Sequence, residues 1–286
     1  DTPDGRLPDT NFRNNGQGVW LGYNLDRHKI GLSLDRYKLS TQTWFDDPEG
    51  QFDDFSVKIP KLEREKIGLF YDYAADGDYL KNIHFDAYTQ TIERKFENRV
   101  KTTQIIPSPM IKALTVSNQT NTNDKQYTQG VTLQGNISLP ANNTLVIGTQ
   151  YQHDKIKQDT DGSTRQTAAT GFFDTQTRTL SYNEAEQSNT SLFAQNDWRF
   201  ADDWTWTVGA RQYWLSSKLN RNDTQTIQSS GTTWQSTGGN SVHDDELVTS
   251  TSLRYSGFED LELRAAYAQG YVFPTLTQLF MQTSAG

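Results

Sequence analysis

The chain has no cysteine, which excludes disulfides, thiolate metal ligands and a cysteine nucleophile. It also lacks any run of roughly 20 apolar residues, the length that a membrane-spanning helix needs. Mean hydropathy is -0.78, and only 34% of the 286 residues are hydrophobic. The formal net charge of -8 argues against a nucleic-acid partner, because such a partner requires a basic surface.

Catalytic motifs are missing as well. The sequence contains no Gly-x-Ser-x-Gly elbow, no glycine-rich phosphate loop and no His-Glu-x-x-His motif. The positions of its four histidines do not suggest a Ser–His pair. No signal peptide opens the chain, so an exported protein with this sequence is either mature or a piece of a larger one. We therefore expect no enzyme, no metal site and no intrinsic cofactor.

The alternation of apolar and polar residues predicts about ten β-strands. They cover 18–26, 28–39, 64–74, 80–94, 126–139, 143–155, 189–200, 203–218, 246–256 and 261–272. Turns of a few residues join them in pairs. Between the pairs lie polar segments of roughly 25 to 30 residues, which we expect to be loops, at 40–63, 95–125, 156–188 and 219–245. Short turns at one end and long loops at the other are typical of an outer-membrane β-barrel, with the turns periplasmic and the loops extracellular.

The two faces of the predicted strands differ in polarity. In 126–139, the residues Val131 and Leu133 share one face, whereas Thr132 and Asn136 share the other. A membrane barrel needs apolar side chains only on the lipid face, so low hydropathy does not exclude it. The half-buried strands of a soluble β-sandwich would show the same alternation. Loop asymmetry and strand length favour the barrel.

Aromatic residues give a measure of strand length. Trp204 and Trp214 have the same parity, and the ten residues between them rise by roughly 24 Å along a barrel axis if the strand is tilted by about 45°. This rise matches the apolar band of about 25 Å that aromatic girdles flank in such barrels. Aromatic residues around the turn at 201–202 are therefore expected to form the periplasmic girdle.

Two segments resemble a known family. The hairpin SLFAQNDWRF at 191–200 and WTWTVGARQY at 204–213 resembles the mid-barrel hairpin of TonB-dependent outer-membrane receptors. The segment YAQGYVFPTLTQLF at 267–280 is similar to the box that follows later in the same barrels. Val272 and Phe273 stand where that box usually has an Arg-Ala pair, so the box is a variant. The resemblance is strong over 185–286 and rests on pattern alone elsewhere.

The resemblance implies an all-β fold, an antiparallel transmembrane β-barrel of about 22 strands in the outer membrane of a Gram-negative bacterium. Because the chain starts and stops in polar segments, we interpret 1–286 as a partial β-barrel domain with about ten of those strands. The plug domain, the C-terminal strands and the TonB box would lie outside it. The implied function is TonB-energised import of a ferric siderophore, with the iron chelate, the protein's own plug, TonB and outer-membrane lipid as partners.

The faces and loops suggest candidate sites. Polar residues of the lumen face would contact the plug or the water around it, although a solvated face of another β protein would look alike. These candidates are Asp197, Arg199, Arg211, Arg254, Glu262 and Arg264. Loop 40–63 places aromatic rings beside carboxylates, as small-molecule sites often do, although packing within the loop is an equal alternative. The ring candidates for ligand binding are Trp44, Phe45, Phe52 and Phe55.

Two alternatives to siderophore import stay open. A haem receptor of the same family needs an axial iron ligand, and His243 is the best-placed histidine for that role. No histidine occurs between Gly270 and Gly286, where haem receptors of the family often have one, so we favour a siderophore. A passive porin, with inward charges that set ion selectivity and no plug, is the second alternative.

Overall fold

The computed structural model describes residues 10–43, 47 and 50–280. It contains one antiparallel sheet of eleven strands and one short helix. The strands are β1 (Asn11–Leu25), β2 (His28–Thr43), β3 (Asp54–Ala74), β4 (Leu80–Ile105), β5 (Ala113–Leu139), β6 (Asn143–Ala168), β7 (Asp174–Ala201), β8 (Trp204–Gln228), β9 (Gly231–Thr237), β10 (Ser241–Tyr255) and β11 (Leu263–Ala268). The helix α1 spans Leu276–Phe280. No helix among these residues is long and apolar enough to cross a membrane.

The strands follow one another in a meander. Each strand from β1 to β8 pairs with the next one in the sequence, and the order ends with β10 and β11. The short strand β9 folds back on 222–228 of β8, whereas β10 pairs with 204–218 of the same strand. Within the described residues, β1 and β11 each have one partner, so the sheet is open. The all-β antiparallel architecture predicted from the sequence is confirmed.

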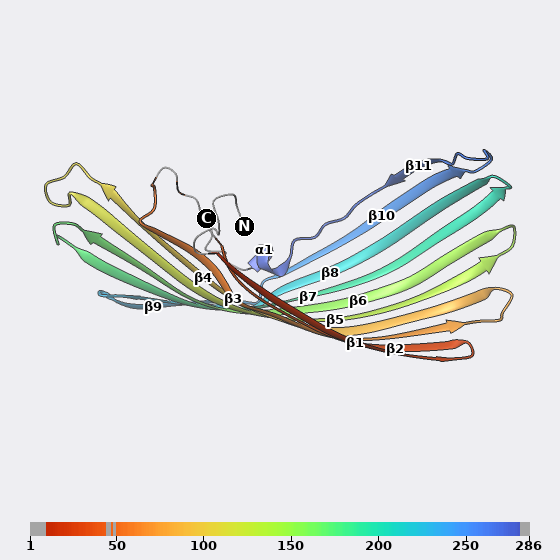
Figure 1. Cartoon of the computed structure of the whole chain (residues 1–286), viewed down its shortest axis with the longest axis horizontal. Coiled ribbons are helices and arrows are strands. Elements are labelled where there is room, and N and C mark those ends of the chain that lie inside the picture. Colours follow the sequence, from red (N-terminus) through yellow and green to blue (C-terminus); the bar gives the residue numbers. More distant parts are fainter. Residues whose placement is uncertain (1–9, 44–46, 48–49, 281–286) are drawn as a thin grey trace.

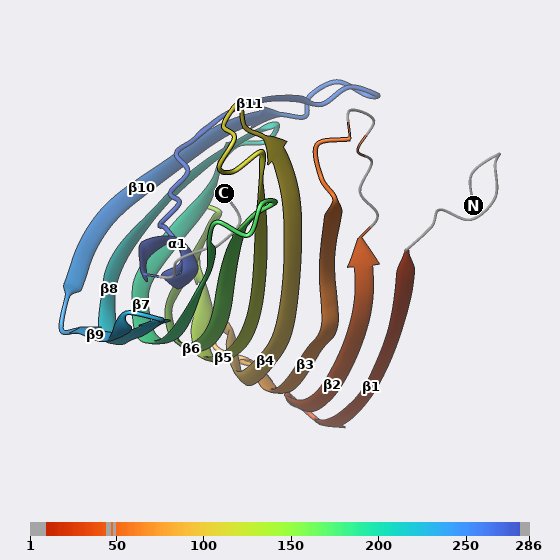
Figure 2. The same cartoon turned by 90° about the vertical axis from the view of Figure 1, so that its left-hand side faces the viewer.

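The sheet is strongly curved, with a concave and a convex face (Figures 1 and 2). Helix α1 lies on the concave side, where Leu276 packs against Ile156, Ala185 and Leu219. In the described part of the chain this is the only cluster of buried apolar side chains, and Ala168 and Leu215 are buried outside it. The other residues that share its face are mostly polar. The sheet is therefore held together chiefly by its backbone ladder rather than by a deep core.

The convex face carries an exposed apolar band. Val131 pairs with Tyr151, and Trp206 pairs with Leu253, so the register carries the same face from strand to strand. Exposed members of this band include Leu34, Ile67, Leu69, Val131, Leu133, Ile147, Tyr151, Leu192, Val208, Leu253, Leu263 and Tyr267. The predicted phasing of the strands is thus confirmed. That lipid covers this band stays a prediction.

The strands are longer than predicted. The main error was to assign their polar extensions to long loops. Segments 95–125 and 156–188, for example, were expected to be loops, but most of each belongs to β4 to β7. The connections on that side that the structure describes in full, at 106–112, 169–173 and 229–230, are short, and 238–240 joins β9 to β10 beside Leu219. Parity failed there because both faces of the strand extensions are polar. The short turns on the other side were predicted correctly, apart from differences of a few residues at their ends.

Aromatic rings cluster at the short-turn end of β7, β8 and β10, as predicted. Trp198 lies 5.6 Å from Phe200 and 6.4 Å from Trp206, measured between ring centroids. Trp204 continues the cluster to Tyr255 at 4.7 Å. Ring contacts at such distances stabilise this end of the sheet by more than the burial of apolar area alone would. They also mark one end of the convex apolar band.

Candidate functional site

The concave face holds a buried polar network near its centre. Asp124, on β5, forms an ion pair with Arg94 of β4. It also accepts a hydrogen bond of 2.9 Å from the amide nitrogen of Gln158, on β6. Asn183, on β7, donates to the amide oxygen of Gln158 at 3.4 Å. Four neighbouring strands thus contribute to one network, because residues that pair across the ladder project from the same face.

A second carboxylate, Asp154, is buried closer to the short-turn end. It accepts hydrogen bonds from Thr128 at 2.5 Å, from Gln152 at 2.7 Å and from Gln126 at 3.3 Å. Within the described residues no cation forms an ion pair with it, so neutral donors alone satisfy its oxygens. Tyr88 extends the network by donating to Gln152 at 3.4 Å. Such a network fixes side-chain positions on an otherwise open surface.

A glycine makes room for the ring of Tyr88. A Cβ atom on Gly130 would lie 2.3 Å from that ring, which is far too close for a real contact. Gly148 stands in the same relation to Phe193, at 2.4 Å. Each aromatic ring therefore reaches over a glycine of the neighbouring strand on the concave face. The two glycines keep this face smooth enough for large rings to cover it.

Four of the predicted lumen residues line one hollow on the concave face. Asp197, Arg254, Glu262 and Arg264 surround a space of about 510 Å³ at the short-turn end of β7 to β11. Asp197 accepts a hydrogen bond of 2.6 Å from Thr207. Arg254 lies 3.7 Å from the carboxylate of Glu262 and donates to Thr205 at 3.3 Å. The hollow is thus lined by hydroxyls and by charges of both signs.

The other two predicted lumen residues lie apart from this hollow. Arg211 donates to Ser191 at 2.8 Å and to Gln150, and its guanidinium packs against the ring of Tyr213 at 4.8 Å. These contacts fix Arg211 on the concave face, farther from the short-turn end than the hollow. Arg199 binds the backbone carbonyl of Asp202 at 2.9 Å, so it stabilises the turn. The sequence could place all six candidates on one side but could not separate these three roles.

Only part of the predicted aromatic loop can be located. Trp44 and Phe45 lie outside the described residues, whereas Phe52 and Phe55 contact each other edge to face at 5.4 Å. Asp47 accepts hydrogen bonds from the backbone nitrogens of Gln51 at 2.9 Å and Phe52 at 2.7 Å. The loop is shorter than expected, because 40–43 belongs to β2 and 54–63 to β3. Pairing of Phe55 with Val100 places Phe55 on the concave side.

His243 lies in a strand and not in a loop. It belongs to β10, opposite Ser216 of β8, and its side chain is exposed. Its parity is that of Leu247 and Leu253, so it projects from the convex face. The prediction that it lies in a loop at 219–245 was wrong. Most of that polar segment belongs to strands, namely the end of β8, all of β9 and the start of β10. Its role as an axial haem ligand stays a prediction, and its position is opposite to the concave sites.

The segment after β11 crosses the concave face, which the sequence did not reveal. Tyr271 donates to the carboxylate of Asp244 at 2.8 Å and packs against Tyr213 at 5.2 Å. Gln187 donates to the carbonyl oxygen of Pro274 at 3.5 Å, just before α1 packs on β7. The similarity at 267–280 singled out these residues but gave no hint of their fold. Their apolar spacing, Leu276 with Leu279 and Phe280, is the signal that could have predicted a docked helical turn.

An open antiparallel sheet with an apolar convex face and a polar concave face defines a section of a β-barrel wall. The model of the family described as "TonB dependent receptor-like, beta-barrel" matches residues 2–286, and the chain belongs to this family. The resemblance found in the sequence is thus confirmed. The family consists of transport receptors of the Gram-negative outer membrane and is not an enzyme family.

One solved structure supports this fold, and two others were matched with lower similarity. The siderophore receptor PiuA from Acinetobacter baumannii is similar over 92% of this chain and 43% of its own, with 13% identity and a TM-score of 0.57. The copper transporter OprC matches 91% of this chain and 53% of its own, with 10% identity and a TM-score of 0.41. The ferric yersiniabactin uptake receptor FyuA from Yersinia pestis matches 94% and 49%, with 11% identity and a TM-score of 0.31. The chain thus spans about half the length of these structures. A search of curated proteins found no match.

Proposed function

We propose that the chain forms part of the wall of an outer-membrane receptor that imports a ferric siderophore with energy delivered by TonB. Membership in the TonB-dependent receptor family carries this proposal. The division between an apolar convex and a polar concave face supports it, because a receptor barrel must meet lipid outside and solvated protein or ligand inside. The concave face would then line the transport path, and the hollow around Asp197 and Arg254 would contact the plug.

The iron chelate would be captured at the end of the sheet that bears β2, β3 and their connection. Phe52 and Phe55 form an aromatic pair there. The predicted ring residues Trp44 and Phe45 belong to the same segment of the sequence. Aromatic faces next to a few polar groups suit a planar or ring-containing chelator. Carboxylates and amides of the concave network, such as Asp124 and Gln158, would lie deeper along the path.

Haem is the second candidate ligand, and its support is weaker. His243 projects from the convex face, away from the path that a plugged barrel would offer. A porin is a further candidate, since the charged hollow would also suit ion selectivity. Neither alternative has a specific observation in its favour that siderophore import lacks.

Uptake by the full-length receptor tests the proposal. A deletion strain starved of iron is complemented with the wild type and grown on a panel of ferric siderophores and haem. We expect growth on at least one siderophore, growth that depends on TonB, and loss of most uptake in the double variant Trp44→Ala and Phe55→Ala. Phe258→Ala, which removes an exposed ring at the short-turn end, serves as the control and should leave uptake unchanged.

Other outcomes favour the alternatives. Growth on haem that is lost in His243→Ala, together with loss of a Soret shift on binding, would contradict the siderophore proposal. Uptake of small solutes without TonB and without saturation would favour a porin. If both ring substitutions were silent for every iron source, the loop between β2 and β3 would have no part in the binding site.

A further inference from the structure

Four lysines form a continuous row on the convex face. They are Lys61 on β3, Lys95 on β4, Lys125 on β5 and Lys157 on β6, and we call them the lysine row. Lys61 pairs directly with Lys95, and Lys125 pairs directly with Lys157. Lys95 pairs with Asn123, two residues from Lys125, so the two pairs are diagonal neighbours. Like charges directly opposite each other destabilise a sheet unless an anion lies between them.

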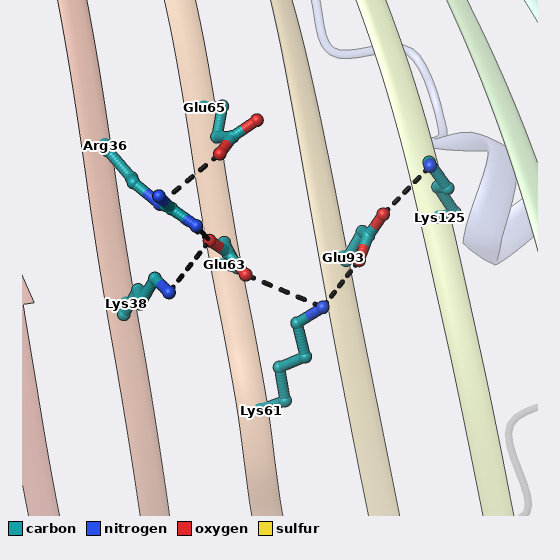
Figure 3. A network of polar contacts seen from close by, with 7 residues as sticks. All are labelled: Arg36, Lys38, Lys61, Glu63, Glu65, Glu93 and Lys125. Carbon is teal, nitrogen blue, oxygen red and sulfur yellow. Dashed lines mark hydrogen bonds and ion pairs between the residues drawn. The ribbon is translucent and has the colours of Figure 1, made fainter.

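Carboxylates of the protein neutralise only part of this row (Figure 3). Glu93 lies 2.6 Å from Lys61 and 2.8 Å from Lys125. Hydrogen bonds from Lys125 and Lys61 lower the pKa of Glu93 to about 2. Glu63 is also 3.5 Å from Lys61, but it is shared with Arg36 and with Lys38 at 3.3 Å. The glutamates therefore stay ionised and fully engaged.

The remaining two lysines of the row lack a close counter-ion. Lys95 forms no ion pair with any residue that the structure describes. Lys157 lies 4.0 Å from Glu184, whose carboxylate is in closer contact with Lys155. The side chain of Lys157 is 42% exposed, as is that of Lys125. Around Lys95 and Lys157, lysines thus outnumber the carboxylates that contact them closely. The ammonium groups of these two lysines can reach an external anion.

The row lies just beyond the apolar band of the same face. On β5, the convex apolar residues run from Leu139 to Tyr127, which corresponds to a rise of roughly 29 Å for a strand tilted by about 45°. Lys125 is the next convex residue, and its ammonium group lies 5.1 Å from the centroid of the Tyr127 ring. If lipid covers the band, the lysine row falls at the level of the head groups. Tyrosine at the border and lysine beyond it are typical of that level.

We propose that the lysine row binds phosphate groups of lipid head groups. These lipids belong to the leaflet that surrounds the end of the sheet opposite the short turns. This inference rests on the proposed function, because it requires the convex band to lie in a membrane. Lysine binds phosphate as a mobile point charge, which suits head groups that differ in orientation. A phosphate between the paired ammonium groups would remove the repulsion that the carboxylates leave uncompensated.

The test compares two double variants of the full-length receptor. Lys95→Gln with Lys157→Gln removes the two lysines that have the weakest contacts with carboxylates, so the sheet should still fold. Lys29→Gln with Lys66→Gln removes the same charge from the concave face, where the two side chains lie over the rings of Phe70 and Tyr88. Each receptor is purified from outer membranes in mild detergent, and the retained phosphorylated lipid is measured per receptor by mass spectrometry and phosphate analysis.

We expect the convex double variant to retain at most half as much phosphorylated lipid as the wild type, and the concave variant to retain the wild-type amount. When the receptors are placed in nanodiscs of lipid that lacks phosphate, the difference in lipid retention between the variants should disappear. Equal retention by both variants would overturn the proposal. Binding of inorganic phosphate with no preference for phosphorylated lipid would also overturn it, because the ligand would then be a free anion.

Membrane fractionation and uptake separate this inference from the proposed function. A wild-type receptor that does not fractionate with the outer membrane overturns both. A receptor that fractionates correctly and imports its ferric chelate, but shows the same lipid retention in both double variants, overturns only the role of the lysine row.

Discussion

At the scale of single residues, Glu93 provides a test in acid. Its pKa is lowered to about 2 from the ordinary value of 4.5 by hydrogen bonds with Lys125 and Lys61. A carboxylate with a lowered pKa stabilises the folded state above its ordinary pKa, and this contribution is lost as the pH falls toward the lowered value. We expect Glu93→Gln to melt below the wild type at neutral pH, and the difference to shrink from pH 4.5 downward until it vanishes near pH 2.

The control is Glu97→Gln, on the same strand and face. Glu97 forms no ion pair in the described part of the chain, so its replacement should change the melting temperature little at any pH. Thermal unfolding of the full-length receptor in detergent, followed at several pH values, gives both comparisons. If the effect of Glu93→Gln did not depend on pH, the ion pairs in Figure 3 would not contribute to stability.

A second residue-scale prediction concerns Val208 and the face from which it projects. Val208 is an exposed member of the convex band, opposite Asn196 and Thr251. An arginine at the midplane of a lipid face costs about 2–4 kcal/mol. Val208→Arg should therefore lower the free energy of unfolding in a bilayer by about 2–4 kcal/mol. The folding yield should fall as well. Gln195→Arg, on the concave face near Asp197, should cost much less than this because the new charge would meet a carboxylate.

Folding titrations into lipid vesicles with urea measure both variants. Similar unfolding free energies for Val208→Arg and Gln195→Arg would contradict the assignment of faces on β8 and β7.

At the scale of elements, the docking of α1 can be tested by hydrogen exchange. Leu276 is the buried contact between α1 and the cluster of Ile156, Ala185 and Leu219. Leu276→Ala should weaken this contact by roughly 2 kcal/mol, at the low end for a buried leucine because the cluster is small. The backbone amide of Leu279, which donates to Thr275 at 3.0 Å, should then exchange roughly thirty-fold faster by local opening.

Thr277→Ala is the matched control within the same helix, since Thr277 is outside the buried cluster. It should leave exchange at Leu279 nearly unchanged, and neither variant should alter exchange in β5. Equal acceleration in both variants would mean that helix propensity, and not packing on β7, holds α1 in place.

The strands show which elements a sequence can reveal. The lower half of β5, 126–139, was predicted because one of its faces is apolar and the other polar. Its other half, 113–125, was missed because polar residues, mostly threonine and asparagine, occupy both of its faces, so that apolar and polar residues do not alternate there. Strand β9 was missed for the same reason, since every residue in it is exposed. Amphipathic alternation therefore reveals a strand only where its two faces differ in polarity.

The candidate site was predictable only in part, because contacts depend on register. Parity placed Asp197 and Arg264 on one face, but the hollow that joins them requires the pairing of β8 with β10 and of β10 with β11. Asp124 and Asp154 were not singled out at all, since nothing local marks a carboxylate that residues of neighbouring strands will bury. The convex position of His243 likewise depended on the strand that contains it.

At the scale of the whole molecule, the open sheet makes an isolated chain unstable in water. Within the described residues, β1 and β11 each present an unpaired edge, and the convex face exposes its apolar band. Unpaired edges and large apolar patches promote aggregation. Residues 1–286 expressed alone should therefore aggregate without detergent, whereas the full-length receptor should be monodisperse in detergent. A monodisperse soluble monomer of 1–286 in size-exclusion chromatography would contradict the account of a barrel section.

The central claim is that the convex face meets lipid and the concave face meets water. The most direct measurement places single cysteines at four successive residues of β5, Val131, Thr132, Leu133 and Gln134, in the full-length receptor; this section of the chain has no cysteine of its own. Each is spin-labelled in a bilayer, and its accessibility to oxygen is compared with that to a water-soluble nickel complex. We predict strict alternation, with 131 and 133 accessible to oxygen and 132 and 134 shielded from it. Four positions with the same accessibility, or alternation of the opposite phase, would contradict the claim.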